Sequence, residues 1–201
     1  MDRDVTVMLP PGADAELALS LERAHHETQV LDRLTAVWSL LLAKCCLLQS
    51  AILHWSIPIG GLAYVWSLSL ALGAFATYHY LRAHEVELLV VPVNRRLGST
   101  LLLGLILTFL GAAHATFALD LVSPPVLAAL TCCLGAIHAL SQAAMRRRAA
   151  PFLGSLAWWT SAWLALRQPD DLALAVVGLG FLLGHALPGL ALVREAVRRR
   201  A

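Results

Sequence analysis

The stretch L-A-L-A-V-V-G-L-G-F-L-L-G-H-A-L-P-G-L-A-L-V, residues 172–193, holds 22 residues without a formal charge. A helix needs about 20 mostly apolar residues to cross the hydrocarbon core of a bilayer. The stretch is long enough, yet it also contains His185 and Pro188. In lipid such residues are tolerated where neighbouring helices satisfy their polar groups. The stretch therefore predicts a membrane helix that is surrounded largely by other helices.

The rest of the chain has the same character. Hydrophobic residues make up 59% of the 201 residues and charged residues only 14%, whereas an ordinary globular domain is about 25% charged. The charges gather in short clusters between long apolar blocks. We predict an all-α fold, a polytopic membrane bundle of six transmembrane helices over residues 34–55, 59–81, 98–119, 124–145, 151–167 and 171–193.

Short connections and arginine placement predict the topology. The first, third and fifth connections are only a few residues long, so the six helices form three antiparallel hairpins. Nearly all arginines lie near the two ends or in the second and fourth connections, and the opposite side holds only Arg167. Positive residues stay in the cytoplasm, so both termini are expected there. We divide the chain into a cytoplasmic segment 1–33 with a short amphipathic helix, the membrane domain 34–193 and a basic tail 194–201.

Small residues on the predicted helices indicate where they pack. Gly180 and Gly184 form a GxxxG face on the sixth helix, which allows close backbone approach in lipid. Pro188 cannot donate to the carbonyl of Gly184 and predicts a kink beside His185. Similar rows of small residues occur on the fourth and third helices: Ala128, Cys132 and Ala136, and Gly104, Gly111 and Ala115.

Lys44 is the one charged residue deep within a predicted span. It lies about 15 Å from the cytoplasmic end at 1.5 Å per residue. Ionisable residues inside a membrane are functional candidates, so a ligand or ion role is one interpretation. The other is that its long side chain reaches toward the cytoplasmic surface or makes a structural contact. No acidic residue inside a span is available as its partner.

Five of the six predicted helices carry a histidine: His54, His79, His114, His138 and His185. A neutral imidazole both donates and accepts, so each one can bond a neighbouring helix. His138 and His185 are expected at similar depth, where such a pair can also hold a haem iron or another metal. An outer pair, His54 with His114, and an inner set that adds His79 would suit two cofactors. This layout resembles that of di-haem membrane cytochromes, although no family motif matches.

The functional predictions follow from what is present and what is missing. The sequence has no Walker loop, GxGxxG, GxSxG or HExxH motif, so enzyme activity is not expected. A net charge of +2 does not indicate a nucleic-acid partner. We predict a bacterial inner-membrane protein that acts as an interaction, sensory or transport-accessory module, in the lipid bilayer and with another membrane protein or a second copy. The alternative is an electron carrier that binds haem or a metal ion through its histidines.

Overall fold

The computed structural model describes residues 13–58, 62–84, 121–146 and 148–198, together with seven positions between 104 and 119. All regular structure in these residues is helical. The helices are α1 (Ala13–His54), α2 (Leu62–Ala83), α4 (Pro124–Arg146), α5 (Ala149–Ala165), α6 (Asp170–Phe181) and α7 (Leu187–Arg198). A π-helical turn, η1 (Leu182–Ala186), joins α6 to α7. The all-α prediction is therefore confirmed.

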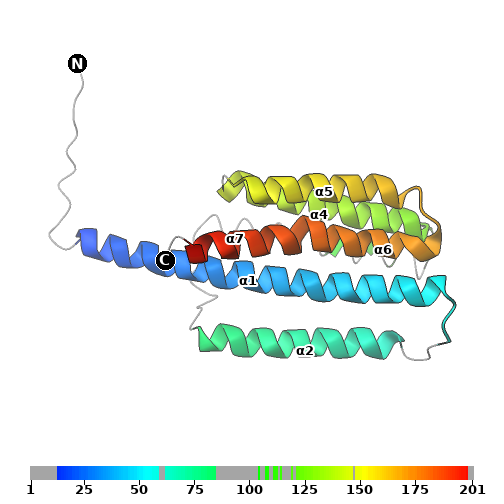
Figure 1. The fold of residues 1–201 in the computed structure, drawn as a ribbon, viewed down its shortest axis with the longest axis horizontal. Coiled ribbons are helices and arrows are strands. Elements are labelled where there is room, and N and C mark those ends of the chain that lie inside the picture. The colour runs from blue at the N-terminus through cyan, green and yellow to red at the C-terminus, as the bar shows by residue number, and fades with distance from the viewer. Residues whose placement is uncertain are drawn as a thin grey trace, which may run out of the picture.

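The long axes of the helices run roughly in one direction. Figure 1 shows the order from α2 through α1 and the α6–α7 rod to α4 and α5. The helix α2 packs only against α1 among the described elements, whereas α6, η1 and α7 contact both α1 and α5. The C-terminus of α1 and the connection from α5 to α6 lie at the same end in Figure 1, and α1 continues past the other helices at the opposite end.

Within the described residues, three helical segments are long and apolar enough to cross a membrane: Gln29–His54, Pro124–Met145 and Asp170–Arg194. They include most of the first, fourth and sixth predicted spans. The second and fifth predicted spans are helical as α2 and α5, and most of the third, 98–119, lies outside the described residues. The amphipathic helix expected within residues 1–33 is continuous with the first span, since α1 runs without a break from Ala13 to His54.

The indole of Trp158 on α5 fills the centre of the bundle and is 1% exposed. Three glycines make room for it: Gly135 on α4, Gly180 on α6 and Gly184 in η1. A Cβ built on any of them would overlap the indole, and the one built on Gly135 would lie 2.6 Å from its nearest ring carbon. The predicted Gly180–Gly184 face thus packs on an aromatic ring. The ring of Phe181 meets the indole edge-on, with the centroids 5.0 Å apart.

The α1 helix packs against the α6–α7 rod through small residues as well. A Cβ added at Gly178 would lie 3.1 Å from the Ala43 carbonyl oxygen, and one added at Gly189 would lie 3.1 Å from the Ala36 Cβ. Ala36, Ala43 and Cys46 are 1–3% exposed. In lipid, leucine gains nothing by leaving its neighbours for a helix, so such close backbone approach is what holds two helices together.

Two indole hydrogen bonds join α1 to α2. The Trp38 Nε1–H on α1 donates to Thr77 Oγ1 on α2 over 2.8 Å. In the opposite direction, the Trp66 Nε1–H on α2 donates to Gln49 Oε1 on α1 over 2.7 Å. Because both donors would be unsatisfied in hydrocarbon, these bonds fix α2 to α1 at two levels.

The C-terminus of α1 is closed by backbone bonds instead of a glycine. The Ile57 N–H donates to the Ile52 carbonyl over 3.1 Å and the Ser56 N–H to the Leu53 carbonyl over 3.2 Å. This is the Schellman pattern, whose turn residue is left-handed and usually glycine. Ser56 takes that place with φ of 48°, and Pro58 follows where the helix has already ended.

We predict that Gly180→Ala lowers the stability of the bundle by about 1–3 kcal/mol, the usual cost of overpacking a close-packed site. The added methyl would overlap the buried indole of Trp158. Resistance of the detergent-solubilised protein to thermal unfolding is the measurement. The matched control is Gly111→Ala, since a Cβ there meets no described residue within 4 Å. Equal melting temperatures for the two variants would contradict this packing.

Candidate functional site

The π-helical turn η1 lies where Pro188 interrupts the helix. Proline has no N–H, so the Gly184 carbonyl lacks its ordinary helical donor. One residue earlier, the Leu187 N–H donates to the Leu182 carbonyl, five residues back, where an α-helix would use the carbonyl four residues back. The helix therefore widens over Leu182–Ala186 at the position for which the sequence predicts a kink. Such turns occur frequently at functional sites, and this one carries His185.

His185 faces His138 across the interface between the widened turn and α4. His138 Nδ1 lies 3.5 Å from His185 Nε2, and the rings meet edge to face with centroids 5.2 Å apart. The Trp158 ring borders the same place, 5.3 Å from the His185 ring between centroids. The pair expected from helix depth is thus in contact.

The distance between His138 Nδ1 and His185 Nε2 bears on whether the pair can hold a small metal ion or a haem. A hydrogen bond usually spans about 2.7–3.2 Å, so 3.5 Å is long for one. Two metal–nitrogen bonds of about 2.0–2.1 Å at a tetrahedral angle place their nitrogens roughly 3.4 Å apart. A haem needs its flat macrocycle between the two rings, and here the rings touch edge to face. The geometry therefore suits a single small ion and does not suit haem.

The indole nitrogen of Trp158 is the other unusual group here. It is a buried donor with no hydrogen-bond partner among the described residues. A donor left unsatisfied in the interior costs about 1–3 kcal/mol. A Cβ built on Gly184 would overlap this nitrogen and the neighbouring ring carbon, so the indole edge is held directly against the widened turn.

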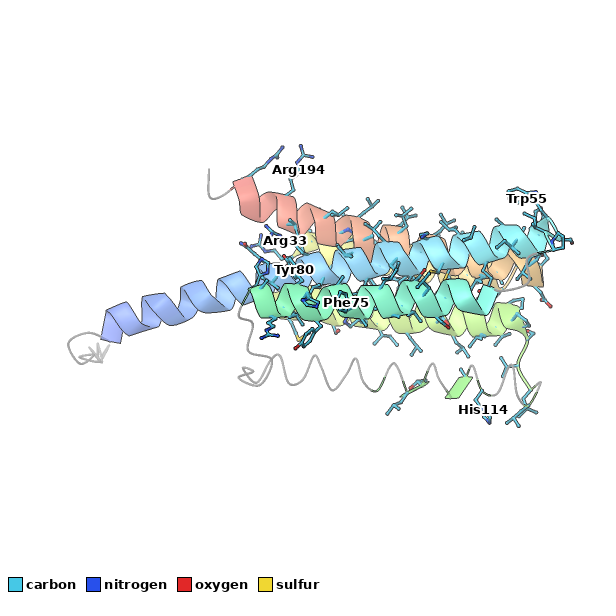
Figure 2. All side chains as sticks on the ribbon, turned by 90° about the horizontal axis from the view of Figure 1, so that it is seen from below. Arg33, Trp55, Phe75, Tyr80, His114 and Arg194 are labelled. Carbon is cyan, nitrogen blue, oxygen red and sulfur yellow. The ribbon has the colours of Figure 1, made fainter. Side chains whose placement is uncertain are left out.

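A second polar cluster joins α1 to α6 at the opposite end of the bundle from Arg33 and Arg194, which are labelled in Figure 2. His54 Nδ1 lies 2.7 Å from Asp171 Oδ2, and both side chains are partly exposed. The Ser50 hydroxyl donates to the Asp171 backbone carbonyl over 2.6 Å. A carboxylate in the first turn of a helix and an imidazole in the last turn of another both suit the helix dipoles. These contacts join α1 to α6 at this end of the bundle.

The structure does not bring the other predicted histidines together. His79 on α2 is exposed, and its ring lies tilted against that of Phe75, with centroids 4.4 Å apart. His114 is also exposed and lies across the bundle from Trp55, the neighbour of His54, in Figure 2. Among the residues that are described, no three His, Cys, Asp or Glu side chains lie close enough to hold a metal ion together.

Lys44 lies on the outside of the bundle. Its side chain is exposed, as are those of Leu40 and Leu48 one turn away on either side. The structure gives Lys44 no ion pair within the described residues. Of the tryptophans on α5, Trp158 is buried, whereas Trp159 and Trp163 are 46% and 54% exposed. Arg167 lies over the Trp163 ring, 3.6 Å from its centroid.

Sequence reasoning did not single out Asp171 or Gln49 as partners. Asp171 lies at the end of a span, where an acidic residue is ordinary, and its pairing with His54 depends on the register of two helices far apart in the chain. Gln49 could have been found from the sequence, because an amide inside a predicted span requires a partner. In the structure that partner is Trp66.

Comparisons with known proteins give no further constraint. No protein-family model, curated protein or solved structure matches this chain.

Proposed function

We propose that the chain is a multi-pass protein of a bacterial inner membrane that acts as a non-enzymatic interaction module, binding another membrane protein. Six spans in three hairpins, with both termini in the cytoplasm, are its topology. The observation that carries the proposal is that the polar groups inside the bundle bond neighbouring helices. The described polar groups there hold helices together, as in the Trp38–Thr77 and Trp66–Gln49 bonds.

The centre of the bundle supports the same interpretation. Trp158 is packed against three glycines, and the core around it consists of small apolar residues such as Cys132 and Ala136, both 0% exposed. No catalytic constellation of nucleophile, base and orienting carboxylate accompanies it among the described residues. We therefore place the functional groups on the outer surface of the bundle, where another protein can contact them.

The distribution of charge along the bundle supports the topology. Arg33 and Arg194 lie at one end in Figure 2, and Trp55 lies at the other. The second end carries Asp171 against His54 and Arg167 stacked on Trp163. A positive end and a nearly neutral end are the pattern of a protein whose arginine-rich side stays in the cytoplasm.

We expect the protein to be held in a complex in its native membrane. Membranes are treated with a lipid-permeant cross-linker, solubilised in mild detergent and analysed for the mass of every species that contains the chain. A complex heavier than the 21.6 kDa chain, with a second membrane protein in it, is the expected result. A monomer before and after cross-linking would contradict the proposal, and a complex of identical chains would replace the partner by a second copy.

A second candidate function, metal binding, is favoured by the contact between His138 and His185. Their nitrogens are 3.5 Å apart, close to the roughly 3.4 Å between two ligands of one tetrahedral ion. His185 Nε2 faces His138 Nδ1, and imidazole nitrogens are among the ligands that Zn²⁺ takes in proteins. We propose Zn²⁺ or another borderline transition metal as the ion, with no haem.

The test uses the full chain, purified without a histidine tag and titrated with Zn²⁺ and with Co²⁺ as the optical probe. His138→Ala and His185→Ala should each weaken Zn²⁺ binding by at least roughly 10- to 100-fold, the usual effect of changing even an outer contact of a metal site. His79→Ala, which changes an exposed ring on α2, is the control. Binding that survives both changes would exclude this site, and a haem absorption band lost in His138→Ala would restore the haem interpretation.

A further inference from the structure

One side of α1 is left uncovered by the bundle. Its exposed residues follow the spacing of a single helical face: Arg33, Val37, Leu40, Lys44 and Leu48. We call these five residues the Lys44 stripe. The other sides of α1 are occupied, one by α2 through Trp38 and Leu41 near Gly73, and one by the α6–α7 rod through Ala36 and Ala43.

Depth makes the lysine unusual. Lys44 is 10 residues from one end of the predicted span 34–55 and 11 from the other, which is about 15 Å in either direction. A four-carbon stem carries the ammonium about 6 Å at most. The charge therefore ends roughly 9 Å short of either boundary of a hydrocarbon core about 30 Å thick. By this estimate the side chain does not reach the cytoplasmic surface by snorkelling alone.

A charge at this depth is stabilised by water or by a polar partner, and an opposite charge is the partner that neutralises it. Intramembrane ionisable residues pair with one another or face a bundle interior, and the described part of this chain pairs Lys44 with neither Asp nor Glu. The sequence contains no acidic residue between Asp32 and Glu85, and none inside any other predicted span except Asp171 at the very end of the last one. A second copy of the chain therefore has no carboxylate to offer at the midplane.

We propose that the Lys44 stripe docks a transmembrane helix of a different membrane protein, one that carries an aspartate or glutamate near the bilayer midplane. This inference rests on the proposed function and specifies its partner. The carboxylate pairs with the Lys44 ammonium, and Leu40 and Leu48 on either side pack against the apolar residues that flank it. Lipid phosphates are excluded as the counter-ion, because they lie at the bilayer surface.

The probe is a synthetic leucine–alanine transmembrane helix with one aspartate at its centre, compared with the same helix bearing leucine there. Full-length protein, labelled through Ser56→Cys at the exposed end of α1, is reconstituted with either helix in phosphatidylcholine vesicles. Energy transfer reports association. We expect the aspartate helix to bind roughly 5- to 30-fold more tightly, as a hydrogen bond or ion pair between model membrane helices of about 1–2 kcal/mol implies.

Three variants of the full chain test the role of the lysine. Lys44→Leu should abolish the preference for the aspartate helix, and Lys44→Arg should keep it because the positive charge remains. His79→Leu, on the exposed side of α2, is the matched control and should have no effect. Removal of an exposed charge from hydrocarbon does not unfold the bundle, and the melting temperature of Lys44→Leu verifies this.

Equal binding of the two helices, or a preference that survives Lys44→Leu, would overturn the inference. Failure of the proposed function has a different signature. If no heteromeric complex forms in native membranes, the proposed binding of another membrane protein is itself wrong. If a complex forms and persists in Lys44→Leu, the module stands and only the Lys44 stripe is excluded as its docking surface.

Discussion

The constraint on which the structure depends is that a polar group in hydrocarbon needs a partner within protein. Water is not available to satisfy it, so each indole, amide and imidazole on the apolar helices either bonds a neighbour or raises the free energy of the folded state. Trp38 and Trp66 meet it by bonding across α1 and α2. Ser50 meets it with the Asp171 carbonyl. These bonds set the register of helices that apolar side chains alone would leave free to slide.

Close packing around Trp158 is the second consequence of the same medium. Because leucine is equally well solvated by lipid and by leucine, association depends on shape. The indole occupies a space that exists only because residues 135, 180 and 184 have no side chain. The same arrangement brings the widened turn at Pro188 against α5 and presents His185 to His138. The space that the three glycines leave for Trp158 thus positions both the core and the contact between His138 and His185.

Much of this could be predicted from the sequence, and the remainder could not for physical reasons. Apolar block length predicts helices such as α4 and α6, and the missing N–H of Pro188 predicts a disturbance beside His185. Helix rise alone places His138 and His185 at one depth. Helix rise does not say which helices are neighbours, so it could not separate the contacting pair from His54 and His114. The partner of His54 proved to be Asp171, and only tertiary packing decides such a choice.

Lys44 illustrates the opposite case, in which the sequence shows the anomaly and the structure gives it meaning. A lysine among leucines is visible in the sequence. A buried lysine would point to a partner inside the bundle, whereas an outward-facing one points to a partner outside it. Its position on the exposed side of α1 directs attention to what lies outside the bundle. The interior contacts hold the helices together, and the exposed charge is the basis of the proposed docking surface.

The account stands on the orientation of the bundle in a bilayer, and accessibility of engineered cysteines tests this most directly. Ser56→Cys, Asp170→Cys and Ala149→Cys are made singly in a chain without its native cysteines, and intact cells are treated with a membrane-impermeant maleimide. We predict labelling at 56 and 170 from outside, and labelling at 149, beside Arg148, only after the cells are opened. Labelling at 149 in intact cells, or protein that dissolves and folds without detergent, would contradict the account.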